Sequence, residues 1–383
     1  MRRGSIGFPH RRQVINMEKK HLSPGKKVLR GVLWALLALV LIAAGYVAYV
    51  FIAYHRIGDQ PLSAENAAGN STAIAAVPRN TELTVTSWNI GFGAYESDYG
   101  FFMDGGHESW AWSKDRLNTN LNEIGRLLAS QNSNFYLIQE VDMDATRSYH
   151  VDEREVLTSA LPSLGYTWAQ NYDSPFLFYP FYQPHGASKS CLMTFSRAKI
   201  TEGMRVELPV ESGFTKILDL DRCYSRQYIP VENGKTLVLY NLHLSAYTSD
   251  GTIATEQLNL LLADMQAEYE KGNYCIAGGD FNKDLLGNSK EIFHVEAADY
   301  NWGQPIPEGT FDKVNISLVA PFDAASPVPS CRNADSAYHE GQYVLTVDGF
   351  LVSDNVSVVS AGVVDTGFAY SDHNPVEMCF ILE

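Results

Sequence analysis

The chain has 383 residues, of which 45% are hydrophobic, so it is long and apolar enough to bury a sizeable core, and its formal net charge is −15. The charge is uneven along the chain. Before residue 57 there are ten Lys or Arg and one acidic residue, Glu18, so the rest of the chain is strongly acidic. This balance argues against strong duplex nucleic-acid binding. It does not exclude a phosphate substrate, since a bound divalent cation reverses the local charge.

Residues 31–54 form an uncharged apolar run of 24 residues. As a helix at ~1.5 Å per residue the run would be ~36 Å long, enough for a hydrocarbon core of ~30 Å. We expect a single-pass cell-membrane anchor, with 1–30 as a basic cytoplasmic segment and the rest of the chain outside, because nine of the ten basic residues before residue 57 precede the run. The alternative is a cleaved signal peptide, whose apolar core is usually shorter.

Residues 55–80 are small, polar and aperiodic, which predicts a linker. No second linker follows, so 81–383 is expected to be one domain, acting as a monomer. Five cysteines lie in this domain, and an odd number cannot all pair. Their spacing fits no zinc site and identifies no disulfide.

The remaining elements alternate between strands and helices. Periodic Leu and Ile residues predict amphipathic helices over 113–130 and around 254–265. Short β-branched or apolar runs predict strands at 84–88, 135–138, 191–195, 236–242, 274–277, 342–347, 356–359 and 375–382. This order predicts a mixed α/β domain with helices covering sheets.

Polar residues able to do chemistry follow or precede many of these strands: Asn89, Glu140, His243, Asp280, Asn282, Asp348, Asp372 and His373. A single polar residue at a strand end is common, but six such strand ends in one domain suggest a shared rim. Asp280 and Asn282 are two positions apart, and in an extended chain they would face the same way. Carboxylate and amide oxygens favour Mg²⁺, with Mn²⁺ possible, over zinc.

Six short motifs occur in order along the chain: SWNIG at 87–91, IQEV at 138–141, NLHL at 241–244, GGDFN at 278–282, VDGFLVS at 347–353 and SDHNPV at 371–376. Together they resemble the endonuclease/exonuclease/phosphatase superfamily of deoxyribonuclease-like metal-dependent hydrolases. The resemblance runs from about Thr81 to the C-terminus. It implies a four-layer sandwich of two mixed β-sheets flanked by helices.

The resemblance also implies roles for the matching residues. Glu140 would be the main metal ligand, assisted by Asn89 and Asp372. Asp280 would orient the attacking water and Asn282 would hold a phosphate oxygen. The two imidazoles complete the implied set: His243 would face the phosphate or leaving group, and His373 would be oriented by Asp348.

Some segments leave alternatives open. Lys189 could touch a substrate phosphate or be a solvated loop residue. Glu153 and Glu155 are candidate partners of His243, but neither can be assigned. The loop 171–186, with its run of aromatic residues, could contact the substrate, pack in the core or face a membrane. The loop 101–110, with Asp104 and His107, could add substrate selectivity to the rim or be a structured loop with no chemistry.

We therefore expect a membrane-anchored, outward-facing, Mg²⁺-dependent phosphoesterase that uses direct attack by a metal-side water. Its substrate could be a lipid head group, an inositol phosphate or nucleic acid. A surface nuclease is the nearest alternative. An inactive ligand-binding module on the same fold is the alternative from another class.

Overall fold

The computed structural model describes residues 23–66, 74–210, 221–246, 252–296 and 302–383. The chain divides into two compact units, residues 1–52 and 53–383. Most of the expected basic segment 1–30 lies outside the described residues, as does part of the expected linker.

The first unit is built around α1, Pro24–Ala53. This helix starts earlier than the expected span 31–54 because Pro24 and the lysines after it continue the same helical run. Among the described residues, α1 is the one helix long and apolar enough to cross a membrane, a test that a signal sequence also passes.

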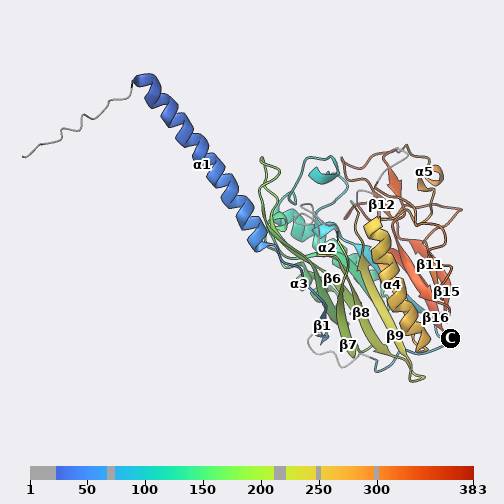
Figure 1. Cartoon of the computed structure of the whole chain (residues 1–383). Coiled ribbons are helices and arrows are strands. Elements are labelled where there is room, and N and C mark those ends of the chain that lie inside the picture. The colour runs from blue at the N-terminus through green and yellow to red at the C-terminus, as the bar shows by residue number, and fades with distance from the viewer. Residues whose placement is uncertain (1–22, 67–73, 211–220, 247–251, 297–301) are drawn as a thin grey trace, which may run out of the picture. The chain divides into compact units, whose positions relative to one another are not determined.

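In the described part of the second unit, the strands form two seven-stranded sheets and a small two-stranded one. Figure 1 shows how these strands are arranged. The first large sheet is ordered β1 (Gln60–Leu62), β7 (Glu202–Glu207), β8 (Cys223–Pro230), β9 (Thr236–His243), β10 (Tyr274–Asp280), β14 (Asp348–Ser353) and β11 (Ile316–Val319). The second is ordered β15 (Val356–Val363), β16 (Val376–Leu382), β3 (Leu83–Asn89), β4 (Phe135–Ala145), β6 (Gly186–Ser196), β5 (Gly165–Leu177) and β2 (Glu65–Asn66). The small sheet pairs β12 (Cys331–Arg332) with β13 (Val344–Leu345), so the strand expected over 342–347 is shorter than predicted.

The helices of this unit are α2 (Lys114–Gln131), α3 (Glu153–Ala160), α4 (Thr252–Glu270) and the single turn α5 (Ser289–Ile292), with short 3₁₀ turns at Gly91–Gly93, Phe102–Asp104 and Thr146–Ser148. Helix α2 begins where Ser113 caps it, because the Ser113 hydroxyl accepts a hydrogen bond from the Arg116 N–H at 3.2 Å. It ends where Asn132 adopts a left-handed conformation.

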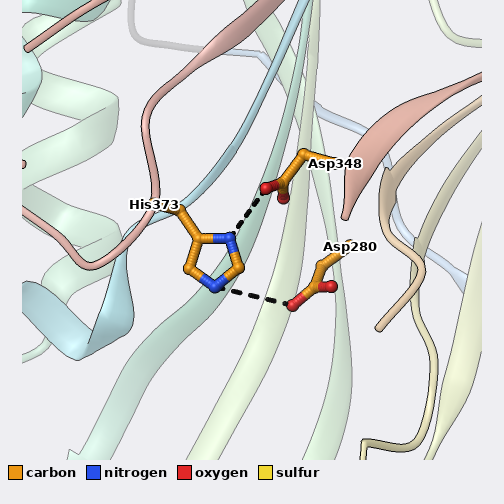
Figure 2. Close-up of side chains that lie close together, drawn as sticks. All are labelled: Asp280, Asp348 and His373. Atoms are coloured by element: carbon orange, nitrogen blue, oxygen red, sulfur yellow. Dashed lines mark hydrogen bonds and ion pairs between the residues drawn. The ribbon is translucent and has the colours of Figure 1, made fainter. Parts of the chain in front are cut away.

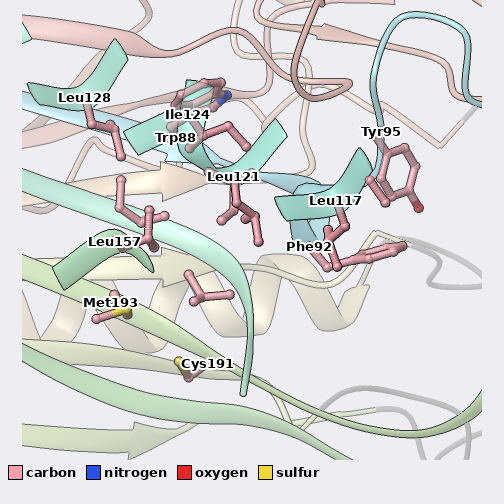
Figure 3. Packing of buried hydrophobic residues seen from close by; sticks show 14 of the residues in the cluster. Trp88, Phe92, Tyr95, Leu117, Leu121, Ile124, Leu128, Leu157, Cys191 and Met193 are labelled. Atoms are coloured by element: carbon pink, nitrogen blue, oxygen red, sulfur yellow. The ribbon is translucent and has the colours of Figure 1, made fainter. Parts of the chain in front are cut away.

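Alternation along β4 explains the layers. Phe135 and Leu137 point between the two sheets, where they pack with Leu239 of β9, while Tyr136 and Ile138 point outward to α2 and α3. Figure 3 shows this outer cluster of α2 leucines against Trp88 and Met193. Helix α4 covers the far side of the other sheet through a third apolar cluster. The arrangement is helix, sheet, sheet, helix, so the predicted four-layer sandwich of two mixed sheets is confirmed.

Part of the segment expected to be a linker is built into the second unit. Strand β1 pairs with β7 and β2 pairs with β5, and Val77 bridges to Val231. Backbone hydrogen bonding at sheet edges needs no apolar periodicity, which explains why residue types alone suggested a linker. The domain boundary at residue 81 stays a prediction.

Candidate active site

The predicted residues gather around two pairs of parallel strands, one in each sheet. In one sheet β3 and β4 run parallel with Asn89 opposite Gln139, one residue before Glu140. In the other β9 and β10 run parallel with His243 opposite Asp280. Parallel strands end at the same edge, so each pair delivers its polar residues to one rim.

Antiparallel neighbours bring the remaining residues to that rim from the opposite direction. Strand β14 begins at Asp348, which is paired with Asp280 at the end of β10. Asp372 and His373 lie shortly before β16 begins, and β16 runs antiparallel to β3. Seven of the eight predicted residues line one cavity: Asn89, Glu140, His243, Asp280, Asn282, Asp372 and His373. Asp348 lies behind them, hydrogen-bonded to His373.

A β-bulge turns Glu140 toward the cavity. The pairing of β4 with β6 shifts register between Ile138 and Val141, and Glu140 has φ of 53°. Without the extra residue, alternation would point Glu140 outward to the helices, as it does Ile138. A left-handed backbone at a glutamate is unfavourable, so the surrounding structure must hold it in place. In the cavity its Oε1 accepts a hydrogen bond from Asn89 Nδ2 at 3.2 Å.

Asp280 and Asn282 face the same cavity, but the expected extended geometry is wrong. Strand β10 ends at Asp280 and the chain turns at once, with φ of 50° at Asn282. The turn is held because the Asn282 N–H donates to Asp280 Oδ1 at 2.8 Å and Asn282 Nδ2 donates to the Leu244 carbonyl at 2.8 Å. Asparagine tolerates this conformation better than most residues. The two side chains therefore face one cavity because a local side-chain hydrogen bond closes a turn, and not because they alternate along an extended strand.

The glycine before Asp280 permits the close approach of β9. Gly279 has φ of 152°, and a Cβ there would lie 2.0 Å from the Leu242 carbonyl oxygen. Any larger residue would push the two central strands apart.

His373 is held by a buried chain of hydrogen bonds (Figure 2). Its Nδ1 lies 2.8 Å from Asp348 Oδ2, and the Ser330 hydroxyl donates to the same oxygen at 2.7 Å. Its backbone carbonyl accepts a hydrogen bond from the Trp88 indole at 2.8 Å. These partners fix the ring so that Nε2 points to Asp280, at 3.8 Å from Oδ2.

The two imidazoles differ in protonation. Burial acts to lower the pKa of His373, but the Asp348 carboxylate, together with Cys331 and Asp372, more than offsets it, and the pKa is raised well above the usual value. Burial, assisted by the charges of Arg222 and His373, holds the pKa of His243 well below its usual value. His243 Nε2 lies 3.5 Å from Asp280 Oδ2 and 4.0 Å from Glu140 Oε1, so its neighbours are the site carboxylates themselves. His373 is thus cationic and His243 neutral at neutral pH.

The carboxylates of the rim repel one another. Burial raises the pKa of Asp280 to about 7, with the Asp348 charge adding to the rise and His373 opposing it. Burial also raises the pKa of Asp372, and Glu140 adds to that rise. Several buried acids with oxygen ligands facing one cavity are the setting that a hard divalent cation stabilises. The residues present therefore fit such a cation.

Two groups of side chains could hold this ion. One is Asp280, Asp348 and His373, whose ligand atoms lie within 4.8 Å of one another. In that group, however, His373 Nδ1 and Asp348 Oδ2 already satisfy each other in a short hydrogen bond. The other group is Glu140 with Asn89 and Asp372, which line the open cavity; Glu140 Oε1 accepts a hydrogen bond from Asn89 Nδ2, and Asn89 Oδ1 accepts one from the Gly91 N–H at 3.0 Å. The metal role of this second group stays a prediction.

The structure also gives partners to residues for which the sequence predicted no role. Ser330 accepts hydrogen bonds from the Val347 and Asp348 N–H groups at 3.0 and 3.1 Å, so it anchors the start of β14. Between the sheets, Gln139 Nε2 donates to Asn241 Oδ1 at 2.8 Å. These residues look ordinary in a linear sequence because only long-range contacts give them partners.

The positions of Lys189, Glu153 and Glu155 bear on the roles that the sequence left open for them. Lys189 is exposed, while its neighbours Ser188 and Ser190 on β6 are buried and Ser190 lines the cavity. Glu153 is buried at the start of α3, where its carboxylate accepts a hydrogen bond from the Asp142 N–H at 2.9 Å, and Glu155 is exposed. The described contacts therefore pair neither glutamate with His243.

The five cysteines are free thiols in the structure, and four of them are buried. Cys331 lies beside the site, with its Sγ 3.5 Å from His373 Nε2. Burial raises the pKa of this thiol to about 12, so it stays protonated.

Comparison with known proteins gives a consistent result. The sequence profile of the Endonuclease/Exonuclease/phosphatase family matches residues 86–373. A search of curated protein sequences finds no match. Among solved structures, the chain is similar to an endonuclease/exonuclease/phosphatase from Beutenbergia cavernae, with 16% identity, a TM-score of 0.53, and coverage of 79% of this chain and 72% of that one.

A second similar structure is ANGEL2, described as a 2',3'-cyclic phosphatase and solved with adenosine-2',3'-vanadate. It has 16% identity and a TM-score of 0.52, and the match covers 84% of this chain and 99% of that one. A third is a family protein from Leptotrichia buccalis, with 13% identity, a TM-score of 0.50, and coverage of 78% and 99%. At these identities the likeness shows the fold.

Proposed function

Because the chain belongs to the endonuclease/exonuclease/phosphatase family of hydrolases, we propose that it is a membrane-anchored, extracytoplasmic, Mg²⁺-dependent phosphoesterase. One observation carries the proposal. Asp280 Oδ2 lies 3.1 Å from Asn89 Nδ2, 3.5 Å from His243 Nε2 and 3.8 Å from His373 Nε2. A carboxylate, an amide and two imidazoles from both sheets thus face one small volume, where a single phosphate group could sit.

The reaction is hydrolysis of a phosphate ester without a covalent enzyme intermediate. The oxygen of a water molecule forms a bond to phosphorus, the bond between phosphorus and the leaving oxygen breaks, and that oxygen takes a proton. Glu140, Asn89 and Asp372 would hold Mg²⁺, or Mn²⁺ in its place, and the ion would offset negative charge on the phosphate oxygens.

The protein residues supply positioning and proton transfer. Asp280 accepts a hydrogen bond from the attacking water and takes its proton, since the carboxylate faces the cavity and its pKa is raised to about 7 by burial. Asn282 orients a phosphate oxygen. His373 is kept protonated by Asp348, so it donates a charged hydrogen bond to the phosphate. His243 is neutral and faces the phosphate or the leaving oxygen.

The anchor proposal rests on the length and composition of α1. Its 30 residues include one uncharged apolar run, and the basic residues of the helix precede that run. The positive-inside rule then directs the N-terminus to the cytoplasm and the hydrolase domain outside. A monomer is sufficient, because one chain supplies the whole set of site residues.

The test uses the full-length chain in detergent with the chromogenic diester bis-p-nitrophenyl phosphate. We expect turnover with Mg²⁺, loss of turnover with a chelator, and recovery when Mg²⁺ is restored. Turnover that survives exhaustive chelation contradicts the metal-dependent mechanism. Absence of turnover on any phosphate ester, with the fold intact by circular dichroism, favours the inactive binding module.

A further inference from the structure

An uncharged loop with exposed aromatic side chains joins β5 to β6. We call Phe178, Tyr179, Phe181 and Tyr182 the aromatic loop; their exposed fractions are 50%, 64%, 83% and 58%. No Asp, Glu, Lys or Arg occurs between residues 176 and 186. A contiguous group of exposed aromatic residues on a soluble domain marks an interaction surface.

The aromatic loop is supported by contacts with the segment that follows β3. The Tyr182 ring stacks on His107 with centroids 4.6 Å apart, and the Tyr182 hydroxyl donates to the His107 carbonyl. The Ser109 hydroxyl donates to the Gln183 carbonyl at 2.5 Å, and the Trp110 indole donates to the Pro184 carbonyl at 2.8 Å. The rings are thus displayed on a fixed support instead of collapsing into the core.

The same two segments border the catalytic cavity. His185, directly after the aromatic loop, lines the cavity, and so do Phe101 and Met103 from the supporting segment. A surface that contacts the aromatic loop therefore lies beside the entrance to the site, although the four rings themselves are not among the cavity-lining residues.

The chain that leaves α1 is fastened close to the base of this loop. Helix α1 ends at Ala53, and two residues later His55 Nε2 lies 3.4 Å from Asp173 Oδ2 on β5. Arg205 donates hydrogen bonds to the carbonyls of Ile57 and Gly58. Asp173 is five residues before Phe178, which is roughly 16 Å at ~3.3 Å per residue. A membrane crossed by α1 would thus lie within reach of the aromatic loop.

We propose that the aromatic loop seats in the head-group layer of the membrane that holds α1, and that the substrate is a phosphodiester of a zwitterionic phospholipid in that membrane. This inference rests on the proposed anchored hydrolase. Tyr favours the membrane interface, and Phe inserts at the boundary between head groups and acyl chains. The loop has no cation to attract anionic lipid or nucleic acid, and the neighbouring acids Asp104 and Glu108 repel both.

The experiment uses the full chain reconstituted in phosphatidylcholine vesicles with Mg²⁺. The test variant combines Tyr179→Ser with Phe181→Ser. The matched control is Val359→Ser, because Val359 is an apolar side chain on β15, 49% exposed, outside both the aromatic loop and the cavity. Each protein is assayed on vesicle lipid, on bis-p-nitrophenyl phosphate and on a single-stranded oligonucleotide.

We expect the double variant to lose about tenfold in turnover of vesicle lipid, because membrane binding scales with buried apolar area, and to keep its turnover of the soluble diester. The control should match wild type on both. Equal lipid turnover by the double variant and wild type overturns the inference and leaves the proposed function standing. A selective loss on the oligonucleotide also overturns it, since the rings would then stack on bases. A wild-type protein inert on all three esters overturns the proposed function itself.

A second measurement reports seating without activity. Phe181→Trp should gain fluorescence quenching by brominated phosphatidylcholine above the wild-type background, and Val359→Trp should not. Equal quenching of the two variants, or none in either, contradicts the seating of the loop in the membrane.

Discussion

The rim holds two histidines in different protonation states, with His373 cationic and His243 neutral. His373 has a buried carboxylate at 2.8 Å and carries charge, while His243 has Nδ1 buried without a hydrogen-bond partner among the described residues and stays neutral. Both rings point at Asp280. The contrast teaches that the partner behind a histidine, more than its distance from the reaction, decides what it can do.

Removal of each imidazole tests this contrast most strongly. We expect His373→Ala to lower kcat by about 10²–10³, because it deletes a charged donor aimed at the phosphate. His243→Ala should cost about tenfold, in line with the smaller value of a neutral hydrogen bond. Steady-state kinetics on the soluble diester measures both, with exposed His150→Ala as the control. Equal losses for the two variants would erase the distinction.

Asp348→Asn sharpens the comparison by changing the charge behind His373. We expect kcat to fall about 10–100-fold, the usual cost of losing an orienting carboxylate. The raised pKa of His373 keeps the imidazolium present to higher pH than usual, so without the carboxylate the charge is lost as pH rises through a lower pKa. The alkaline limb of the kcat profile should therefore shift to lower pH. An unchanged alkaline limb, with reduced kcat, would show that Asp348 acts only in packing.

Ser330→Ala should have the smallest effect. It removes the acceptor of two buried N–H groups and one donor to Asp348. We expect the free energy of unfolding to fall by about 1–3 kcal/mol, with only a few-fold change in kcat, and urea denaturation measures the first. Exposed Ser326→Ala is the control. A larger loss of activity than Asp348→Asn would place Ser330 in the chemistry.

Much of the fold could be predicted from the sequence, because strand and helix periodicities are local. The order of motifs led to the right family, and the helices near 113–130 and 254–265 are present as α2 and α4. Sheet order, and the edge strands β1 and β2 within the expected linker, depend on long-range backbone pairing that residue types do not encode.

The candidate site, like the fold, could be predicted from the sequence only in part. Residue types and strand ends led to eight side chains that the structure brings to one rim, and their roles stay predictions. The bulge at Glu140 could not be predicted, since it depends on the pairing of β4 with β6. The turn at Asn282 could not be predicted either, because its local hydrogen bond to Asp280 is joined by one to the distant Leu244 carbonyl. Ser330 gave no signal at all, because serine is common and its importance here comes from hydrogen bonds with Val347 and Asp348.

The bulge in β4 has one more consequence. Because Glu140 reaches the rim through a single extra residue in the ladder, the length of this strand is as critical as its composition. Excising Gln139 would restore regular alternation, and Glu140 would then follow Ile138 directly and turn its carboxylate into the apolar space between the two sheets. The domain could then still fold, but it would lose activity because of a change in residue spacing alone.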